Sequence, residues 1–199
     1  MSNSESMDAL LMCGGRGTRL RPAIGDTEKP LVEINGKPMV DHVLAALRES
    51  AVGSITAAVS PATPKTAEQL ATYDDVRTIE TPGEGYVSDL SMVLSAVETP
   101  VVTVTSDLPL LAGTHVDRAI AVADGDSLAV CVPLSVAERV GASTETTVEH
   151  RGNTVVPTGL NTVGDGSDRL VVWAVERLAC NVNRPADLRL AEQWLVDSV

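Results

Sequence analysis

The sequence predicts an α/β fold in which helices cover both faces of a Rossmann-like, doubly wound, mostly parallel sheet. Short aliphatic runs of strand length alternate with stretches whose apolar residues recur at helical spacing. Loops containing Gly and Pro separate these runs, as in repeated β–loop–α units. The 199 residues are 44% hydrophobic and include no Phe, so we expect one aliphatic core.

In the first half of the chain we expect four strands, beside the turns that carry the candidate chemistry. Asp8–Cys13 is apolar after its first residue, which predicts a strand buried on both faces. Gly36-Lys37-Pro38 separates a short strand from a helix with apolar residues at helical spacing. The expected elements are strands over Asp8–Cys13, Leu31–Asn35, Ser54–Val59 and Val76–Ile79, and helices over Met39–Ser50 and Lys65–Tyr73.

The second half continues this alternation and then becomes irregular after Pro133. The expected elements are helices over Tyr86–Val97 and Thr114–Ala123, strands over Val101–Thr105, Ser127–Val132, Val155–Val163 and Leu170–Val175, and a terminal helix. Asn183 suits the N-cap of the terminal helix and Pro185 its first turn. The polar segment Ser135–Asn153 is expected to cross the active face.

We expect a single domain over residues 8–199, preceded by a flexible extension, residues 1–7. These first residues are polar and lack the basic-then-apolar order of a signal peptide. No apolar run approaches the roughly 20 residues of a membrane span. The sequence therefore predicts a cytoplasmic protein without stable membrane insertion.

The formal net charge of −12 restricts the partners of this chain. Binding of nucleic acid requires a basic surface that neutralises phosphates, so we expect no nucleic-acid partner. Acidity of this degree is consistent with solubility alone or with a salt-adapted cytosol. Cys13, Cys131 and Cys180 form no CxxC pair, which favours buried thiols over a disulfide framework or a zinc site.

The turn Gly14–Arg19 follows the first strand and contains three glycines. Glycines in such a turn also occur without a ligand, but here they would let backbone N–H groups approach a polyphosphate closely. Arg16, Arg19, Arg21 and Lys29 concentrate positive charge nearby in an acidic chain. The candidate nucleotide contacts here are Leu11, Met12, Gly14, Gly15, Arg16, Gly17 and Thr18.

Two further positions offer ligands near strand ends. Asp107 directly follows the strand Val101–Thr105 and its Ser106, where doubly wound sheets bind ligands, and its carboxylate suits Mg²⁺ or a turn cap. Gly159 permits close approach of a substrate or forms a β-bulge, and Asn161 offers an amide. We take Gly159 and Asn161 as candidate substrate contacts.

The strand followed by Gly-Gly-Arg-Gly-Thr-Arg-Leu and then Lys29-Pro30-Leu31 resembles the nucleotidyltransferase superfamily that includes sugar-phosphate and molybdenum-cofactor transferases. The resemblance implies the nucleotide-diphospho-sugar transferase type of fold. It also implies that Asp107 and Asn183 bind Mg²⁺ or Mn²⁺. The loop Thr81–Gly85 and the segment Ser60–Thr66 would then contact the base, with Ser60, Gly85 and either Glu80 or Asp89 as candidates.

Within that superfamily, the strings Ser60–Thr66 and Gly83–Leu90 resemble the archaeal guanylyltransferases that act on adenosylcobinamide phosphate. The resemblance implies transfer of GMP from GTP to this corrinoid phosphate, with release of pyrophosphate, in cobalamin biosynthesis or salvage. Lys29 would contact the α-phosphate, Arg19 the departing phosphates, and Asp107 the metal. The acidity suggests a haloarchaeal member. Arg184 differs from the Thr usual at its position, and Cys13 from the usual Ala.

Two alternatives remain at this stage. The first is a related transferase for the molybdenum cofactor or a sugar 1-phosphate. The second is a non-catalytic regulator that binds GTP on the same fold.

Overall fold

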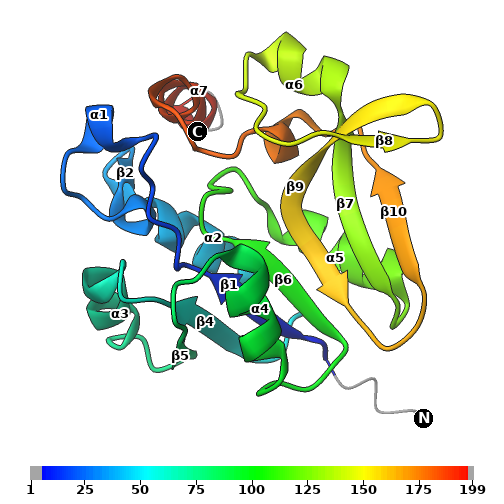
Figure 1. The fold of residues 1–199 in the computed structure, drawn as a ribbon, viewed down its shortest axis with the longest axis horizontal. Helices are drawn as coiled ribbons and strands as arrows, with labels where there is room; N and C mark the ends of the chain where they lie inside the picture. Colours follow the sequence, from blue (N-terminus) through cyan, green and yellow to red (C-terminus); the bar gives the residue numbers. More distant parts are fainter. Residues whose placement is uncertain (1–5, 197–199) are drawn as a thin grey trace.

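A computed structural model describes residues 6–196, which form an eight-stranded sheet with helices on both faces (Figure 1). The strand order is β10-β7-β9-β6-β1-β4-β5, with β8 paired to β9. The sheet strands are β1 (Asp8–Met12), β4 (Ile55–Val59), β5 (Val76–Glu80), β6 (Val101–Thr105), β7 (Ser127–Pro133), β8 (Val148–His150), β9 (Asn153–Val163) and β10 (Asp168–Val172). The α-helices are α1 (Arg21–Ile24), α2 (Met39–Arg48), α3 (Pro64–Leu70), α4 (Tyr86–Leu94), α5 (Gly113–Ala123), α6 (Leu134–Val140) and α7 (Pro185–Val196), and the 3-10 turns are Lys29–Leu31 and Glu176–Ala179.

The strand directions confirm the predicted mostly parallel sheet. Strand β1 lies parallel to both β4 and β6, and β5 lies parallel to β4. Their carboxyl ends therefore meet at one edge, where an open α/β sheet binds ligands. Strand β9 was expected as a strand, but its antiparallel course between β6 and β7 was not anticipated.

The core lies on both faces of β1 because successive side chains of a strand point to opposite sides. Ala9 and Leu11 pack in the large cluster with apolar residues of α2 and α5. Leu10 and Met12 pack on the other face with Val93 of α4. This two-sided burial is what the apolar run in β1 predicted.

Three local predictions need correction. The expected strand Leu31–Asn35 is shortened to β2 (Glu33–Ile34), which follows the 3-10 turn Lys29–Leu31 and pairs with β3 (Lys37–Pro38) outside the main sheet. Part of the irregular segment after Pro133 is α6. The helix expected over Tyr86–Val97 ends at Leu94, and its Val87 is 79% exposed, whereas Val93 is buried.

The ends of the described chain are held by specific contacts. Residues 1–5 of the expected extension lie outside the described residues, while the Met7 carbonyl accepts the Gly53 N–H at 3.0 Å. Ala191 of α7 packs with Ile34 of β2 and Val182 in a second cluster. The single domain over 8–199 stays a prediction. Among residues 6–196, no helix is both long enough and apolar enough to cross a membrane.

Candidate active site

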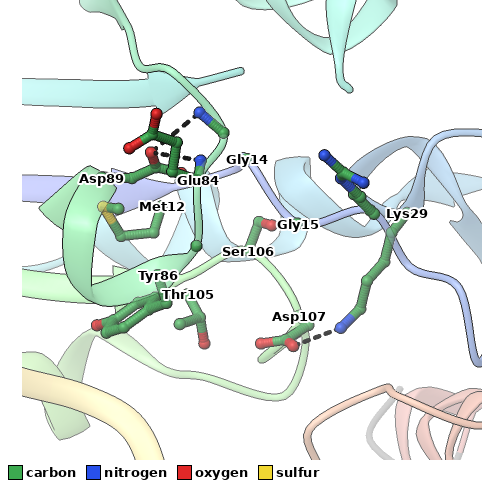
Figure 2. Close-up of a pocket in the computed structure, with 13 residues that line it drawn as sticks. Met12, Gly14, Gly15, Lys29, Glu84, Tyr86, Asp89, Thr105, Ser106 and Asp107 are labelled. Atoms are coloured by element: carbon green, nitrogen blue, oxygen red, sulfur yellow. Dashed lines mark hydrogen bonds and ion pairs between the residues drawn. The ribbon is translucent and has the colours of Figure 1, made fainter. Parts of the chain in front are cut away.

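A pocket of about 510 Å³ opens at the carboxyl edge of β1 and β6. Figure 2 shows Lys29 and Asp107 pointing toward one another on one side of it, with Asp89 and Glu84 on another. The candidate residues that line it are Met12, Gly14, Gly15, Arg16, Lys29, Gly85, Asp89 and Asp107. Gly83, Glu84, Tyr86, Thr105 and Ser106 also line it and were not selected as site residues from the sequence.

The turn after β1 presents unpaired backbone donors to this pocket. Among the described residues, none accepts a hydrogen bond from the backbone N–H groups of Gly14–Thr18. The turn is nevertheless fixed, because the Ser60 hydroxyl donates to the Gly14 carbonyl at 3.0 Å and the Leu20 N–H donates to the Gly17 carbonyl. Free N–H groups on a fixed backbone are suited to an anionic ligand.

Gly17 lets this turn pass close to Lys29. Its φ is +59°, a left-handed conformation that favours glycine, and a Cβ on it would lie 2.7 Å from the Lys29 Cβ. The residue before Lys29 is also anchored, since the Glu28 carboxylate accepts the backbone N–H groups of Lys65 and Thr66. The backbone on both sides therefore sets where the Lys29 side chain begins.

The Lys29 ammonium lies between two candidate metal ligands. It donates to Asp107 Oδ2 and to Asn183 Oδ1, each at 2.6 Å, and the Lys29 and Asp107 side chains are only 11% and 16% exposed. Burial alone would raise the pKa of the Asp107 carboxyl, but attraction to Lys29 and hydrogen bonds from Lys29 and Asn181 together hold that pKa below its usual value. Asp107 is therefore an anion in this structure.

The same oxygens fit a hard divalent cation. Asp107 Oδ2 and Asn183 Oδ1 converge on one positive charge, and carboxylate and amide oxygens are ligands that Mg²⁺ accepts. No cluster of three or more His, Cys, Asp or Glu side chains suited to a metal occurs in the described part of the chain. A cation held here would depend on phosphate and water oxygens for its other ligands, as Mg²⁺ commonly does.

Asn183 does not have the local role predicted for it. We expected its side chain to cap the terminal helix, but its amide oxygen accepts from Lys29, and the helix begins at Pro185. The backbone N–H groups of Asn183 and Arg184 instead donate to the Asp187 carboxylate, at 3.0 and 2.8 Å. Asp187 was missed as a site residue, because its other partner, Ser143, lies in a distant segment without a recognisable pattern.

The two carboxylates proposed for base recognition lie in different surroundings. Asp89 lines the pocket, and its Oδ1 accepts the N–H groups of Gly83 and Glu84 (Figure 2). Glu80, at the end of β5, is exposed and does not line the pocket. Ser60 lies behind the glycine turn rather than on the pocket wall.

The remaining nucleotide candidates lie around the pocket rather than in its wall. Leu11 is fully buried in the core, so only its backbone is available. Thr18 and Arg19 are exposed. The Arg19 guanidinium forms an ion pair with Glu145, a residue that the sequence did not single out.

A smaller pocket of about 300 Å³ adjoins the first through Tyr86 and Thr105. Both substrate candidates, Gly159 and Asn161, line it. Gly159 has φ +83°, and a Cβ there would collide with Thr105 Oγ1, so glycine is required by both conformation and space. Glu145 lines this pocket as well.

Comparison with known proteins supports both the fold and the class of reaction. Residues 9–154 match the family model described as a MobA-like NTP transferase domain. The chain is 32% identical over 203 residues to adenosylcobinamide-phosphate guanylyltransferase of Methanocaldococcus jannaschii, covering 95% of this chain and 97% of the relative. A shorter match, 41% over 58 residues, joins 29% of this chain to 24% of 2-aminoethylphosphonate cytidylyltransferase of Lancefieldella rimae.

Two solved structures share the fold at low sequence identity. One is CMP:2-keto-3-deoxy-manno-octonic acid synthetase complexed with CTP, with a TM-score of 0.68, 16% identity and coverage of 98% and 100% of the two chains. The other is a putative glucose-1-phosphate thymidylyltransferase of Bacillus anthracis, with a TM-score of 0.71, 12% identity and 96% coverage of both chains. The expected nucleotide-diphospho-sugar transferase type of fold is thereby confirmed.

Proposed function

Because this chain belongs to the family of MobA-like NTP transferase domains, we propose that it transfers GMP from GTP to adenosylcobinamide phosphate. An oxygen of the acceptor phosphate bonds to the α-phosphorus of GTP. The bond from this phosphorus to the oxygen bridging to the β-phosphate breaks, and pyrophosphate leaves with that electron pair. The products are adenosylcobinamide-GDP and pyrophosphate, as in cobalamin biosynthesis or salvage.

The observation that carries this proposal is the position of Lys29 between the glycine turn and Asp107. The turn offers free backbone N–H groups, and Gly17 passes directly against the Lys29 side chain. A triphosphate on the turn brings its α-phosphate to the side where Lys29 and Asp107 lie. This arrangement supports nucleotidyl transfer over a site that only stores a nucleotide.

Catalysis in this scheme consists of positioning and charge neutralisation. The attacking phosphate is already ionised, so no general base is required. Lys29 contacts the α-phosphate and stabilises its developing charge. Arg16, which lines the pocket, and Arg19, together with the turn amides, hold the phosphates that leave.

We propose Mg²⁺ or Mn²⁺ as the metal, held by Asp107 and Asn183 and completed by phosphate and water oxygens. When bound, such an ion neutralises phosphate charge. Asp107 and Asn183 also accept the Lys29 ammonium. Lys29 must therefore be able to exchange these oxygens for a phosphate oxygen.

The acceptor enters through the smaller pocket in this proposal, where Gly159 and Asn161 contact it. We place the reaction in the cytoplasm of a haloarchaeon. The net charge of −12 and the three free, buried cysteines support that setting. The absence of a CxxC pair had predicted buried thiols, and all three cysteines are buried and free.

The test uses purified protein, Mg²⁺, each of GTP, UTP and CTP, and three acceptors in turn: adenosylcobinamide phosphate, molybdopterin and a sugar 1-phosphate. We expect pyrophosphate release only with GTP and the corrinoid phosphate. Preference for another pair would assign the chain to a different transferase. Binding of GTP without pyrophosphate release from any acceptor would indicate a regulator.

A further inference from the structure

Arg19, Glu145 and Arg184 form a charge cluster, hereafter the rim cluster, in which Glu145 lines the smaller pocket and both arginines pair with Glu145. The two oxygens of Glu145 each pair with a different arginine: Oε2 with the Arg19 guanidinium, and Oε1 with Arg184 Nε at 3.3 Å. The Glu145 side chain is 17% exposed, whereas the arginines are 63% and 57% exposed. The cluster thus joins the glycine turn, the segment between α6 and β8, and the start of α7.

A buried carboxylate fixes two of these segments in place. Asp187 is fully buried and accepts the backbone N–H groups of Asn183 and Arg184. It also accepts the backbone N–H and the hydroxyl of Ser143, at 2.7 and 2.6 Å. The backbone of Arg184 and the segment that carries Glu145 are therefore held by one buried group.

The net charge of the rim cluster favours an anion, whereas the lining of the smaller pocket alone does not. Glu145 is the one charged side chain, among the described residues, that lines the smaller pocket. This carboxylate repels a phosphate monoester that enters the smaller pocket, unless a nearby cation offsets the repulsion. Two guanidinium groups against one carboxylate leave one positive charge in excess. Guanidinium groups bind phosphates and carboxylates through the same paired N–H donors.

We infer that Arg184 binds the phosphate monoester of the acceptor, and that this phosphate displaces the Glu145 carboxylate from the Arg184 guanidinium. The inference rests on the proposed function, because it assigns the acceptor side of that reaction. Arg184 stands where the resembling transferases usually have Thr, so Arg184→Thr is the informative replacement.

The direct test compares Arg184→Thr and Arg184→Lys with Arg139→Thr. Arg139 is an equally exposed arginine that pairs with Glu176 and lines neither pocket, so its variant controls for the loss of one positive charge. We expect Arg184→Thr to raise the KM for adenosylcobinamide phosphate by about 10-fold or more, as for loss of a hydrogen bond to a charged group. Arg184→Lys should recover part of this loss, and the KM for GTP should change less than twofold for each variant.

An equal rise in the KM for GTP would overturn the inference, because Arg184 would then serve the triphosphate. An unchanged acceptor KM would overturn it as well. Thermal unfolding midpoints of all variants should agree within a few degrees; a large fall for Arg184→Thr, with the acceptor KM restored on cooling, would show a structural role instead.

Glu145→Gln tests the exchange from the other side. Removing the competing carboxylate should lower the acceptor KM, by about threefold if one weak ion pair is lost. Glu138→Gln, an exposed glutamate on α6, removes the same charge away from both pockets and should leave that KM unchanged. A higher acceptor KM in Glu145→Gln would contradict the exchange.

Failure of the proposed function can be told apart from failure of this inference. If the unaltered protein releases no pyrophosphate with adenosylcobinamide phosphate, the proposed function fails. Calorimetric binding of methyl phosphate to the GTP-loaded protein then tests the site without turnover. Weaker binding to Arg184→Thr than to Arg139→Thr supports the phosphate site, and equal binding overturns it.

Discussion

Lys29 lies where the proposed nucleotide site and the proposed metal site meet in the pocket. The sequence predicted Lys29, Asp107 and Asn183 as separate site residues, each from a different string. The structure brings the three together through two hydrogen bonds of 2.6 Å. That proximity depends on chain folding over long sequence separations: the segment before α7 lies against the end of β6, where the Val182 N–H donates to the Asp107 carbonyl at 2.8 Å.

Replacing Lys29 with Met should lower turnover by about 10²–10³-fold, because a charge contact to the reacting phosphate is lost. Steady-state pyrophosphate release at saturating GTP measures this. Lys37→Met is the control, since Lys37 lies in β3 and lines neither pocket. Turnover near that of the control would remove Lys29 from the chemistry.

The three buried cysteines lead to a prediction about the stability of the fold at alkaline pH. Burial raises the pKa of Cys13 and Cys180 to about 12 and that of Cys131 to about 11, from an ordinary value of 9.0. Because the folded-state pKa values are raised, their contribution to stability is present below pH 9.0 and is lost as pH rises toward the folded values. The urea concentration at the midpoint of unfolding should therefore decrease as the pH is raised from 8 to 10.5. Cys13→Ala should show a shallower fall, and an equal fall would contradict the assignment.

At the scale of the elements, the glycine turn shows which features local sequence signals predict and which contacts they do not predict. Strand β1 and the turn were predictable because an apolar run and several glycines are local signals. The close contact between Gly17 and Lys29 was not, because it depends on the path of the chain between them, and Lys29 begins a 3-10 turn that was not predicted. That turn sets where the lysine side chain begins.

Gly17→Ala and Gly25→Ala separate this contact from backbone strain. Both glycines have φ +59°, but only at Gly17 would a Cβ meet another residue, the Lys29 Cβ at 2.7 Å. Each variant should lose on the order of 1–3 kcal/mol of unfolding free energy from its positive φ, and Gly25→Ala no less than Gly17→Ala, because Gly25 also has a ψ of −127°. Only Gly17→Ala should also lose turnover, at least tenfold, through displacement of Lys29. Equal activity of the two variants would exclude a positioning role for this contact.

The loop before α4 forms another part of the pocket in which we propose that GTP binds. Asp89, at 5% exposure, holds the loop amides of Gly83 and Glu84, so it organises the wall that Gly85 and Tyr86 complete. The sequence could not choose between Asp89 and Glu80, because both flank the same loop and exposure is decided by how α4 packs.

Asp89→Ala should raise the Kd of GTP about tenfold, since it releases two hydrogen bonds to a charged acceptor. Glu80→Ala should leave that Kd unchanged, because Glu80 lies on the surface outside the pocket. Equilibrium titration with a fluorescent GTP analogue, displaced by GTP, measures both. A larger effect from Glu80→Ala would reverse the choice of carboxylate.

At the scale of the whole molecule, the parallel part of the sheet followed from local patterns and the rest did not. The spacing of apolar residues indicates each β–loop–α unit. It predicted the ends of β1, β4, β5 and β6 to within about one residue. The antiparallel insertion of β9 between β6 and β7 is a non-local pairing that its own residues do not encode. The rim cluster was missed for the same reason, since Glu145 lies in a segment without a recognisable pattern.

For the whole molecule we propose transfer of GMP to a corrinoid phosphate. The most direct test follows labelled phosphorus from GTP into the products. Parallel reactions contain adenosylcobinamide phosphate with GTP labelled at the α- or the γ-phosphorus. The account predicts that α-label enters the corrinoid product and γ-label appears in pyrophosphate, in equal amounts and only when the acceptor is present. Release of γ-label as inorganic phosphate, with no α-label in the corrinoid, would contradict it.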